Sequence, residues 1–384
     1  MLLYSGTNPP KKPVPVREHT SPPPPTGRDH GPAAFFHGRT DIRSRFSTVL
    51  SESIALNAGT TFLIQGAPGA GKSALLAKLC EEAPNWKVAT IGSQELWNPV
   101  AMAQAIDEAY ELNREIAASI GIEFFKLGGV KRVAGDASPQ QILKRLSPKQ
   151  GLILVLDEAQ KLRRLLPQNK EQAIATLDAI HNGELTKPVV LLTAGLGISE
   201  NVFKTLDVSR FARGCVNHLG RLGRKEERAV IHDWLTKAGG AVGDTSEWID
   251  AIALHAHGWP QHIICYAITA KESLESQQGH MTDEGLHFTL QQGDLERQIY
   301  YTARMKDITL RQRKVLARIF ANLPKESPIE KDQLIDALTE NYSSEVAANM
   351  FDELLHRGVV TSIGHGSYSI PIPSFYTWLV DNYG

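Results

Sequence analysis

Residues 66–73 read Gly66-Ala67-Pro68-Gly69-Ala70-Gly71-Lys72-Ser73 and fit the pattern G-x-x-x-x-G-K-S/T at every fixed position. An apolar run, TTFLIQ at 60–65, precedes this stretch, and a helical pattern, ALLAKLC at 74–80, follows it. In this setting the glycines let backbone N–H groups curl around phosphate oxygens, and the helix N-terminus adds a partial positive charge. The stretch therefore predicts a nucleotide-binding α/β domain.

Each position of this phosphate loop has an expected role. Lys72 can reach the β- and γ-phosphates, and the Ser73 hydroxyl can ligate Mg²⁺. We expect ATP and Mg²⁺ as cofactors, with the nucleotide held by the loop and the first turn of its helix: Gly66, Ala67, Pro68, Gly69, Ala70, Gly71, Lys72, Ser73 and Ala74.

A second motif, LILVLDEAQ at 152–160, places two acids directly after an apolar strand. Asp157 is expected to hold the Mg²⁺, usually through water, and Glu158 to orient and polarise the water that attacks the γ-phosphate. A buried strand ending in two solvated acids is the alternative, and the upstream phosphate loop favours the catalytic interpretation.

Further apolar runs predict strands at 87–91, 189–193 and 215–219. Strands separated by helices are typical of a doubly wound α/β domain with a parallel sheet. Thr193 ends one strand and either binds the γ-phosphate or the lytic water, or merely caps the strand. Arg210 and Arg213 precede the last strand and are either an arginine finger for a neighbouring subunit or a surface pair.

The pattern divides the chain into four parts. Residues 1–33 form a proline-rich tail, 34–221 the nucleotide-binding domain, 222–305 a helical lid, and 306–384 three helices with a β-hairpin, as in a winged helix. A glycine-rich segment at 121–136 looks inserted; it is either a loop that faces a pore or DNA, or a surface hairpin. Helices are expected at 41–57, 99–118, 138–146, 224–238, 246–257, 260–276, 282–304, 310–321, 331–340 and 344–357.

Composition limits the possible partners and surroundings. The chain has 384 residues and a formal net charge of −1, so no global field attracts a polyanion and any nucleic-acid contact needs a local patch. Three scattered cysteines fit buried thiols in a reducing compartment. No apolar run approaches the length of a membrane span. We expect a soluble, cytoplasmic protein.

Together these motifs resemble the AAA+ ATPases, in the branch that holds origin-recognition initiators, STAND signalling ATPases, and transposon-regulator or secretion ATPases. The resemblance covers residues 35–384 and is carried by FFHGR at 35–39, SRFARG at 209–214, Gly258-Trp259-Pro260, and GSYSIPIPSFYTWL at 366–379. It implies that Gly38 and Arg39 lie beside adenine, that Pro260 begins the last lid helix and lies at the nucleotide, and that the chain ends in a winged helix.

One departure concerns the lid. Members with a sensor-2 arginine carry it just after the proline, where this chain has Gln261 and then His262. Glutamine cannot supply a positive charge, and histidine does so only when protonated. This favours slow, assembly-dependent ATP hydrolysis by a homo-oligomeric switch.

Two functions remain open. In the first, the oligomer binds double-stranded DNA and recruits or regulates a partner protein; in the second, it is a STAND-like signalling or defence ATPase whose winged helix binds protein. The charge of residues 306–384, eight Lys/Arg minus ten Asp/Glu or −2, does not favour DNA. Arg311, Arg313, Lys314 and Arg318 cluster in one helix, whereas the expected recognition helix at 344–357 is acidic.

Overall fold

The computed structural model describes residues 35–110, 123–127, 130–134, 137–146, 151–185, 187–206, 208, 215–306, 308–322, 328–364 and 367–384. For residues 110, 123–127 and 130–134 only the backbone is described. The predicted proline-rich tail at 1–33 lies outside these residues. Within the ranges given, no helix is both long enough and apolar enough to cross a membrane.

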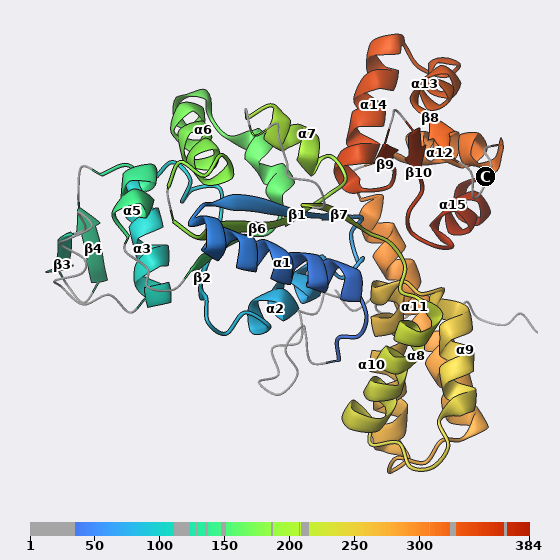
Figure 1. The fold of residues 1–384 in the computed structure, drawn as a ribbon. Helices are drawn as coiled ribbons and strands as arrows, with labels where there is room; N and C mark the ends of the chain where they lie inside the picture. The colour runs from blue at the N-terminus through green and yellow to red at the C-terminus, as the bar shows by residue number, and fades with distance from the viewer. Residues whose placement is uncertain are drawn as a thin grey trace, which may run out of the picture.

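The centre of the molecule is a five-stranded parallel sheet in the order β2-β5-β6-β1-β7 (Figure 1). Its strands are β1 (Thr60–Gly66), β2 (Lys87–Ile91), β5 (Leu152–Leu156), β6 (Val189–Gly195) and β7 (Val216–Leu219). The central strands have continuous apolar sequences because helices cover both faces. The predicted doubly wound α/β fold is confirmed.

Helices pack on both faces of this sheet. On one face lie α1 (Thr40–Leu56) and α2 (Lys72–Glu81), whose buried side chains join those of β1 in one core cluster. On the other face lie α3 (Pro99–Tyr110), α5 (Pro139–Arg145), α6 (Pro167–His181) and α7 (Ser199–Lys204), with the 3₁₀ helix η1 (Ala159–Arg164). Alternate residues along the strands belong to the core cluster on one face or to the core cluster on the other, because successive side chains of a strand point to opposite faces of the sheet.

The helix α5 begins as its sequence predicts. Ser138 accepts a hydrogen bond from the backbone of Gln141, the Gln141 side chain returns one to the Ser138 backbone, and Pro139 occupies the first turn. The preceding insert forms an antiparallel hairpin, β3 (Glu123–Leu127) and β4 (Val130–Ala134). Whether this hairpin serves a pore or DNA remains a prediction.

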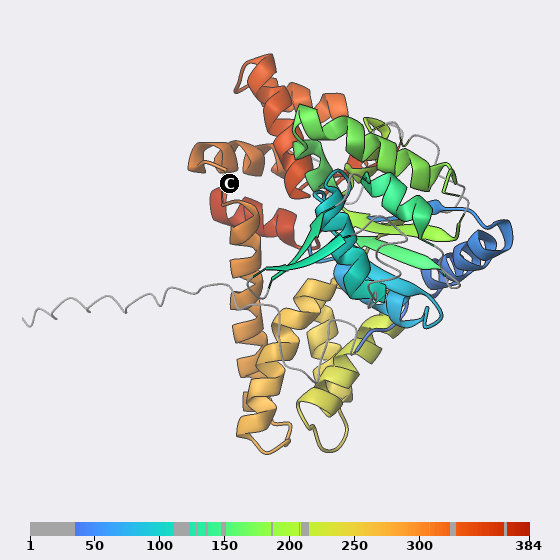
Figure 2. The same ribbon diagram turned by 90° about the vertical axis from the view of Figure 1, so that its left-hand side faces the viewer.

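The lid consists of α8 (Arg224–Asp233), α9 (Ser246–Ala256), α10 (Pro260–Ser276) and α11 (Asp283–Arg304), around a separate core cluster. The continuous helix expected at 224–238 changes at Trp234 into a π-helical turn, η2 (Trp234–Ala238), closed by a Gly239 N–H to Trp234 carbonyl bond. Figure 2 shows α11 running the length of the lid and ending beside the C-terminal unit.

The C-terminal unit contains α12 (Leu310–Asn322), α13 (Lys331–Thr339), α14 (Ser344–Arg357) and α15 (Phe375–Tyr383). Its antiparallel sheet has the order β8-β10-β9, formed by β8 (Ile329–Glu330), β9 (Thr361–Gly364) and β10 (Ser367–Ser369). The expected helices and hairpin are present, whereas the two-residue strand β8 is too short to be seen as a pattern. The four domain boundaries remain predictions.

A buried histidine connects the lid to the C-terminal unit. His262 on α10 is fully buried; its Nδ1 lies 3.2 Å from the Ala256 carbonyl oxygen and its Nε2 lies 3.1 Å from the Tyr301 hydroxyl. That hydroxyl donates to the Pro373 carbonyl at 2.8 Å, just before α15. Burial, followed by the nearby charge of Arg297, lowers the pKa of His262 to about 3, so the ring is neutral at pH 7.

We expect this histidine to make stability depend on acid. An unfolded histidine has a pKa of about 6.5, so below that pH the unfolded chain binds one more proton than the folded chain. The contribution of His262 to the free energy of unfolding is complete above pH 6.5. It declines by about 1.4 kcal/mol per pH unit as the pH falls toward 3. Urea unfolding between pH 7 and 4 should show a shallower decline for His262→Gln, whereas the exposed control His280→Gln should keep the wild-type slope. Equal slopes for wild type and His262→Gln would contradict the assignment.

Candidate active site

The phosphate loop joins β1 to α2 in the way its glycines allow. Gly69 and Gly71 have φ values of 80° and 88°, in the left-handed region that glycine adopts without strain. A Cβ at Gly69 would lie 2.7 Å from the Gln261 Cβ and 2.8 Å from the Tyr300 hydroxyl. Both the backbone conformation and the space around Gly69 therefore require glycine.

Lys72 is held over the inside of this loop. Its Nζ donates to the carbonyl oxygens of Gly66 at 3.0 Å and Ala67 at 3.1 Å, and its side chain is buried. Burial lowers the pKa of Lys72, while the charges of Glu158 and Asp157 act in the opposite direction. The buried Lys72 ammonium group therefore lies at the phosphate loop, where it can form a charge-assisted hydrogen bond with a bound phosphate.

Ser73 and Asp157 meet where a divalent cation would be bound. The Ser73 hydroxyl donates to Asp157 Oδ2 at 2.8 Å, although the two residues are far apart in sequence. A hydroxyl and a carboxylate are oxygen ligands suited to Mg²⁺, which keeps several waters and uses few protein groups. The pair fits the predicted metal role, and the cation would neutralise phosphate charge when bound.

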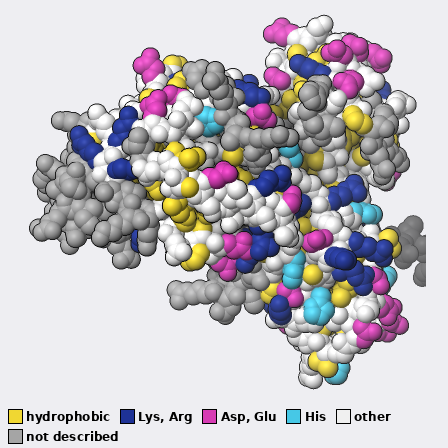
Figure 3. Space-filling model, viewed as in Figure 1, with side chains coloured by type: hydrophobic (Ala, Val, Ile, Leu, Met, Phe, Trp, Pro, Cys, Tyr) yellow, Lys and Arg dark blue, Asp and Glu magenta, His cyan; other side chains and the backbone are white. Residues whose placement is uncertain are grey.

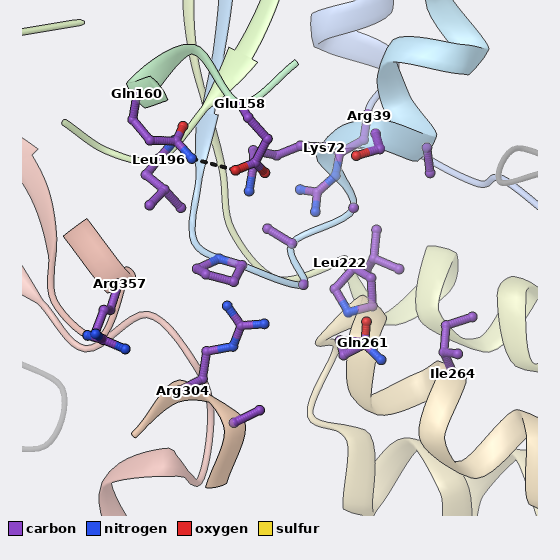
Figure 4. Close-up of a pocket in the computed structure, with 18 of the residues that line it drawn as sticks. Arg39, Lys72, Glu158, Gln160, Leu196, Leu222, Gln261, Ile264, Arg304 and Arg357 are labelled. Carbon is purple, nitrogen blue, oxygen red and sulfur yellow. Dashed lines mark hydrogen bonds between the residues drawn. The ribbon is translucent and has the colours of Figure 1, made fainter. Parts of the chain in front are cut away.

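Glu158 follows Asp157 in a left-handed conformation, with φ 58°, which turns its side chain toward the loop. Its Oε2 accepts a hydrogen bond of 2.6 Å from Gln160 Nε2, and Gln160 Oε1 accepts one of 3.1 Å from the Leu196 N–H just beyond β6. Figure 4 shows Gln160 between these two partners. Gln160 thus fixes the carboxylate that is expected to polarise water.

The segment FFHGR lies between the loop and the lid. Arg39 donates to the Gly220 carbonyl at 2.5 Å and the Arg221 carbonyl at 3.3 Å, and burial lowers the pKa of its guanidinium. His37 Nε2 lies 2.9 Å from the Asp233 carboxylate on α8. Gly38 cannot carry a side chain, because an added Cβ would lie 2.4 Å from Glu226. Arg39 therefore positions the segment through backbone carbonyls, and it forms no ion pair with an acid among the residues that the structure describes.

The lid holds the loop from outside. The Gln261 backbone N–H donates to the Gly69 carbonyl at 3.1 Å, and the Tyr300 hydroxyl donates to the Pro68 carbonyl at 2.7 Å. Trp259 Nε1 approaches the same hydroxyl at 3.4 Å. Since Gln261 is uncharged and His262 is neutral, neither residue places a positive charge beside the loop.

The C-terminal unit also reaches the loop. A Cβ at Gly358, directly after α14, would lie 2.4 Å from Pro68 Cδ, so the two residues are packed together. Gly197, after β6, is similarly close to Thr361 on β9. One cavity of about 1390 Å³ is lined jointly by the phosphate loop, the FFHGR segment, η1, the lid and the end of α14 (Figure 4). The end of α14 contributes Glu353, His356 and Arg357 to that lining.

Most of the predicted site residues meet in this cavity. Its lining includes Arg39, Pro68, Gly69, Ala70, Gly71, Lys72, Ser73, Ala74, Glu158 and Pro260. Gly38, Gly66, Ala67 and Asp157 adjoin it without being among the lining residues. Thr193 lies on β6 beside β1, but its side chain is fully buried, and its hydroxyl has no partner among the described residues. The role of Thr193 stays a prediction, and Arg210 and Arg213 lie outside the described residues.

The sequence did not indicate Gln160, Arg304 and Arg357, which line the cavity, or Tyr300, which donates a hydrogen bond to the phosphate loop. Gln160 directly follows the strand motif, and its polar amide two residues after Glu158 is a local signal that could have indicated a partner for the carboxylate. Tyr300, Arg304 and Arg357 come from helices far along the chain, and only the packing of those helices brings them to the loop.

Comparison with known proteins agrees with this geometry. Residues 57–199 match the family model described as an AAA domain. No curated protein matches the chain. The solved structures that resemble it include the Walker-type ATPase of Pyrococcus abyssi, with 15% sequence identity and a TM-score of 0.55 over 90% of this chain and 97% of that one. Another is the ORC2 protein of Aeropyrum pernix in ADPNP–ADP complexes, with 13% identity and a TM-score of 0.55 over 90% and 93% of the chains.

At these identities the two solved structures bear on the fold alone. The phosphate loop after β1 and the paired acids after β5 both lie within the residues that match the family model. Residues 57–199 match the AAA domain model, and the chain has the α/β fold of the P-loop AAA+ proteins.

Proposed function

We propose that this protein is an ATP-hydrolysing molecular switch whose C-terminal unit senses the nucleotide and acts on a partner. The observation that carries the proposal is the packing of Gly358 on Pro68, with the end of α14 lining the nucleotide cavity. A change in the phosphate loop on ATP binding would act directly on that unit. Two conformations with different nucleotide affinity are the requirement for such a switch.

The catalytic part of the proposal assigns one task to each group. Lys72 and the loop amides bind the phosphates, Ser73 and Asp157 hold Mg²⁺ when it is bound, and Glu158 accepts a proton from the attacking water. Gln160 keeps the Glu158 carboxylate in place. The AAA domain at 57–199 supports ATP as the nucleotide, as does the similar fold of a protein described as a Walker-type ATPase.

We propose that turnover is slow and depends on assembly of several copies. Neither Gln261 nor His262 provides a cation after the lid proline. We propose that Arg210 or Arg213 of a neighbouring copy supplies one in a homo-oligomer, as an arginine finger stabilises the charge of the transition state.

A second candidate, direct binding of double-stranded DNA, is favoured by a basic stripe on α12. Arg311, Lys314 and Arg318 are exposed at helical spacing and line a hollow that ends at Asn341. The helix α14 is poorly suited to this role, because Figure 3 shows acidic side chains gathered over α13 and α14. The exposed acidic residues of this region are Asp332, Asp336, Glu340, Glu345, Asp352 and Glu353. Without DNA, the switch would act on protein alone, as in the STAND-like alternative.

Two variants test the nucleotide site. Lys72→Ala should lose ATP binding by at least tenfold, because it removes the buried phosphate-binding cation. Glu158→Gln keeps the shape of the side chain and should bind ATP with wild-type affinity, but it should lower kcat about 100-fold or more, since an amide cannot accept the proton. Fluorescent ATP titration and phosphate release measure the two effects. Hydrolysis by Glu158→Gln at the wild-type rate would show that another group is the base.

A disulfide tests the switch. A Cβ at Gly197 would lie 3.5 Å from the Thr361 Cβ, a separation that suits a cross-link. In Gly197→Cys/Thr361→Cys, oxidation should proceed at rates that differ at least about threefold between ATP-bound and ADP-bound protein, because only one state keeps the C-terminal unit docked. The single cysteine variants are the controls, and burial raises the pKa of native Cys80 to about 11, so its thiol competes little. Equal rates in both nucleotide states would refute the switch.

The basic stripe is tested by salt dependence. If three phosphate contacts come from α12, neutralising Arg311, Lys314 and Arg318 to Gln should reduce the slope of log affinity against log salt by about 2 to 3. Fluorescence anisotropy with duplex DNA measures the slope, and Lys225→Gln on the lid surface is the control for loss of an exposed charge. If wild type shows no binding at low salt, the DNA candidate fails and the protein-directed switch remains.

A further inference from the structure

We infer that Arg304, at the end of the last lid helix, binds the terminal phosphate of ATP and supplies the positive charge that Gln261 cannot. This inference rests on the proposed function, because it assumes that ATP occupies the cavity described above. Nothing in the sequence pattern around Arg304 marks it as a nucleotide-binding residue.

The Arg304 side chain lies at the nucleotide cavity. Arg304 is the last residue of α11 and lines the same cavity as Pro68, Lys72 and Glu158. In Figure 4 its guanidinium points from the end of α11 toward the phosphate loop. A basic residue in the last turn of a helix interacts favourably with the helix dipole, which explains a cation at this position but not its direction into the cavity.

The Arg304 guanidinium packs against an aromatic ring. The Arg304 Cζ lies 5.2 Å from the centre of the Tyr300 ring, in the range of a cation–π contact. The Tyr300 hydroxyl in turn donates to the Pro68 carbonyl. The Tyr300 side chain therefore contacts both Arg304 and the phosphate loop. It fixes the position of the Arg304 guanidinium relative to the loop.

The Nε of Arg304 has no hydrogen-bond acceptor among the described residues. Among the described residues, Arg304 makes no ion pair, and its Nε is buried without a hydrogen-bond partner. The acids nearest in the cavity are already engaged, since Glu158 accepts from Gln160 and Glu353 pairs with Arg357 at 2.6 Å. A buried guanidinium N–H without an acceptor costs free energy that a phosphate oxygen would recover.

A fourth observation is the charge repulsion between Lys72 and Arg304, two of the cationic side chains that line the cavity. After burial, which has the largest effect, the positive charge of Arg304 is among the influences that lower the pKa of Lys72. Lys72 and Arg304 therefore repel each other until an anion lies between them. A triphosphate carries the charge that relieves this repulsion, and its terminal phosphate adds a charge that ADP lacks.

The test compares ATP with ADP binding in the full chain. Arg304→Gln should weaken binding of a non-hydrolysable ATP analogue about 10- to 100-fold, as expected for loss of a charge-assisted hydrogen bond. Binding of ADP should weaken less than about threefold, and Arg304→Lys should restore part of the ATP affinity. The matched control is Lys306→Gln, which removes an exposed charge two residues further along the chain and should change neither affinity.

The outcomes separate this inference from the proposed function. If wild-type protein binds no ATP, the proposed function fails and this inference fails with it, because the phosphate that Arg304 would contact is then absent. If wild type binds ATP and Arg304→Gln binds both nucleotides as well as wild type does, the inference is overturned. Equal weakening of ATP and ADP also overturns it, because the terminal phosphate would then not be the group that Arg304 contacts.

Discussion

The arrangement of this molecule depends on the way the outer carbonyl groups of the phosphate loop are satisfied. The loop must leave its N–H groups available for phosphate, so its carbonyls need other donors, and the carbonyls of Pro68 and Gly69 find theirs outside the loop. Gln261 and Tyr300 provide those donors for Gly69 and Pro68 from the lid. Gly358 then packs on the other side of Pro68. The phosphate loop is therefore also the place where the α/β domain, the lid and the C-terminal unit meet.

A buried aromatic cluster extends that connection beyond the loop. Tyr300 and its neighbour Tyr301 lie on one turn of α11, with ring centres 5.7 Å apart. Tyr301 packs against Phe375 of α15 at 5.4 Å and donates to the Pro373 carbonyl. Adjacent tyrosines thus connect the loop on one side and the C-terminal unit on the other. Because rings pack at fixed distances, a shift of α11 is carried to both neighbours.

Much of the fold and the central site could be predicted because their signals are local. The apolar runs at 60–65, 152–156 and 189–193 become β1, β5 and β6, and the phosphate loop and Asp157-Glu158 follow directly from two of those strands. The parallel pairing of β1 and β5 with β6 then brings the two motifs to one edge of the sheet. Ser138 likewise begins α5 through a cap that four consecutive residues define.

What could not be predicted depends on packing between distant segments. The strand position of Thr193 was right, but the side of the sheet toward which a residue points depends on register, and its hydroxyl is buried away from the lining of the cavity. A residue that the sequence did not indicate, Gln160, donates the hydrogen bond that positions the Glu158 carboxylate. Arg304 and Arg357 reach the cavity because α11 and α14 end there, which no local pattern encodes.

The length of α11 has a mechanical consequence. It has 22 residues and so is a rod of about 33 Å, anchored among the lid helices and ending at the nucleotide cavity. A rotation of about 10° around the lid end would move the Arg304 end by roughly 6 Å, more than one helical turn. The helix would therefore act as a lever, converting a small tilt of the lid into a large displacement of the C-terminal unit.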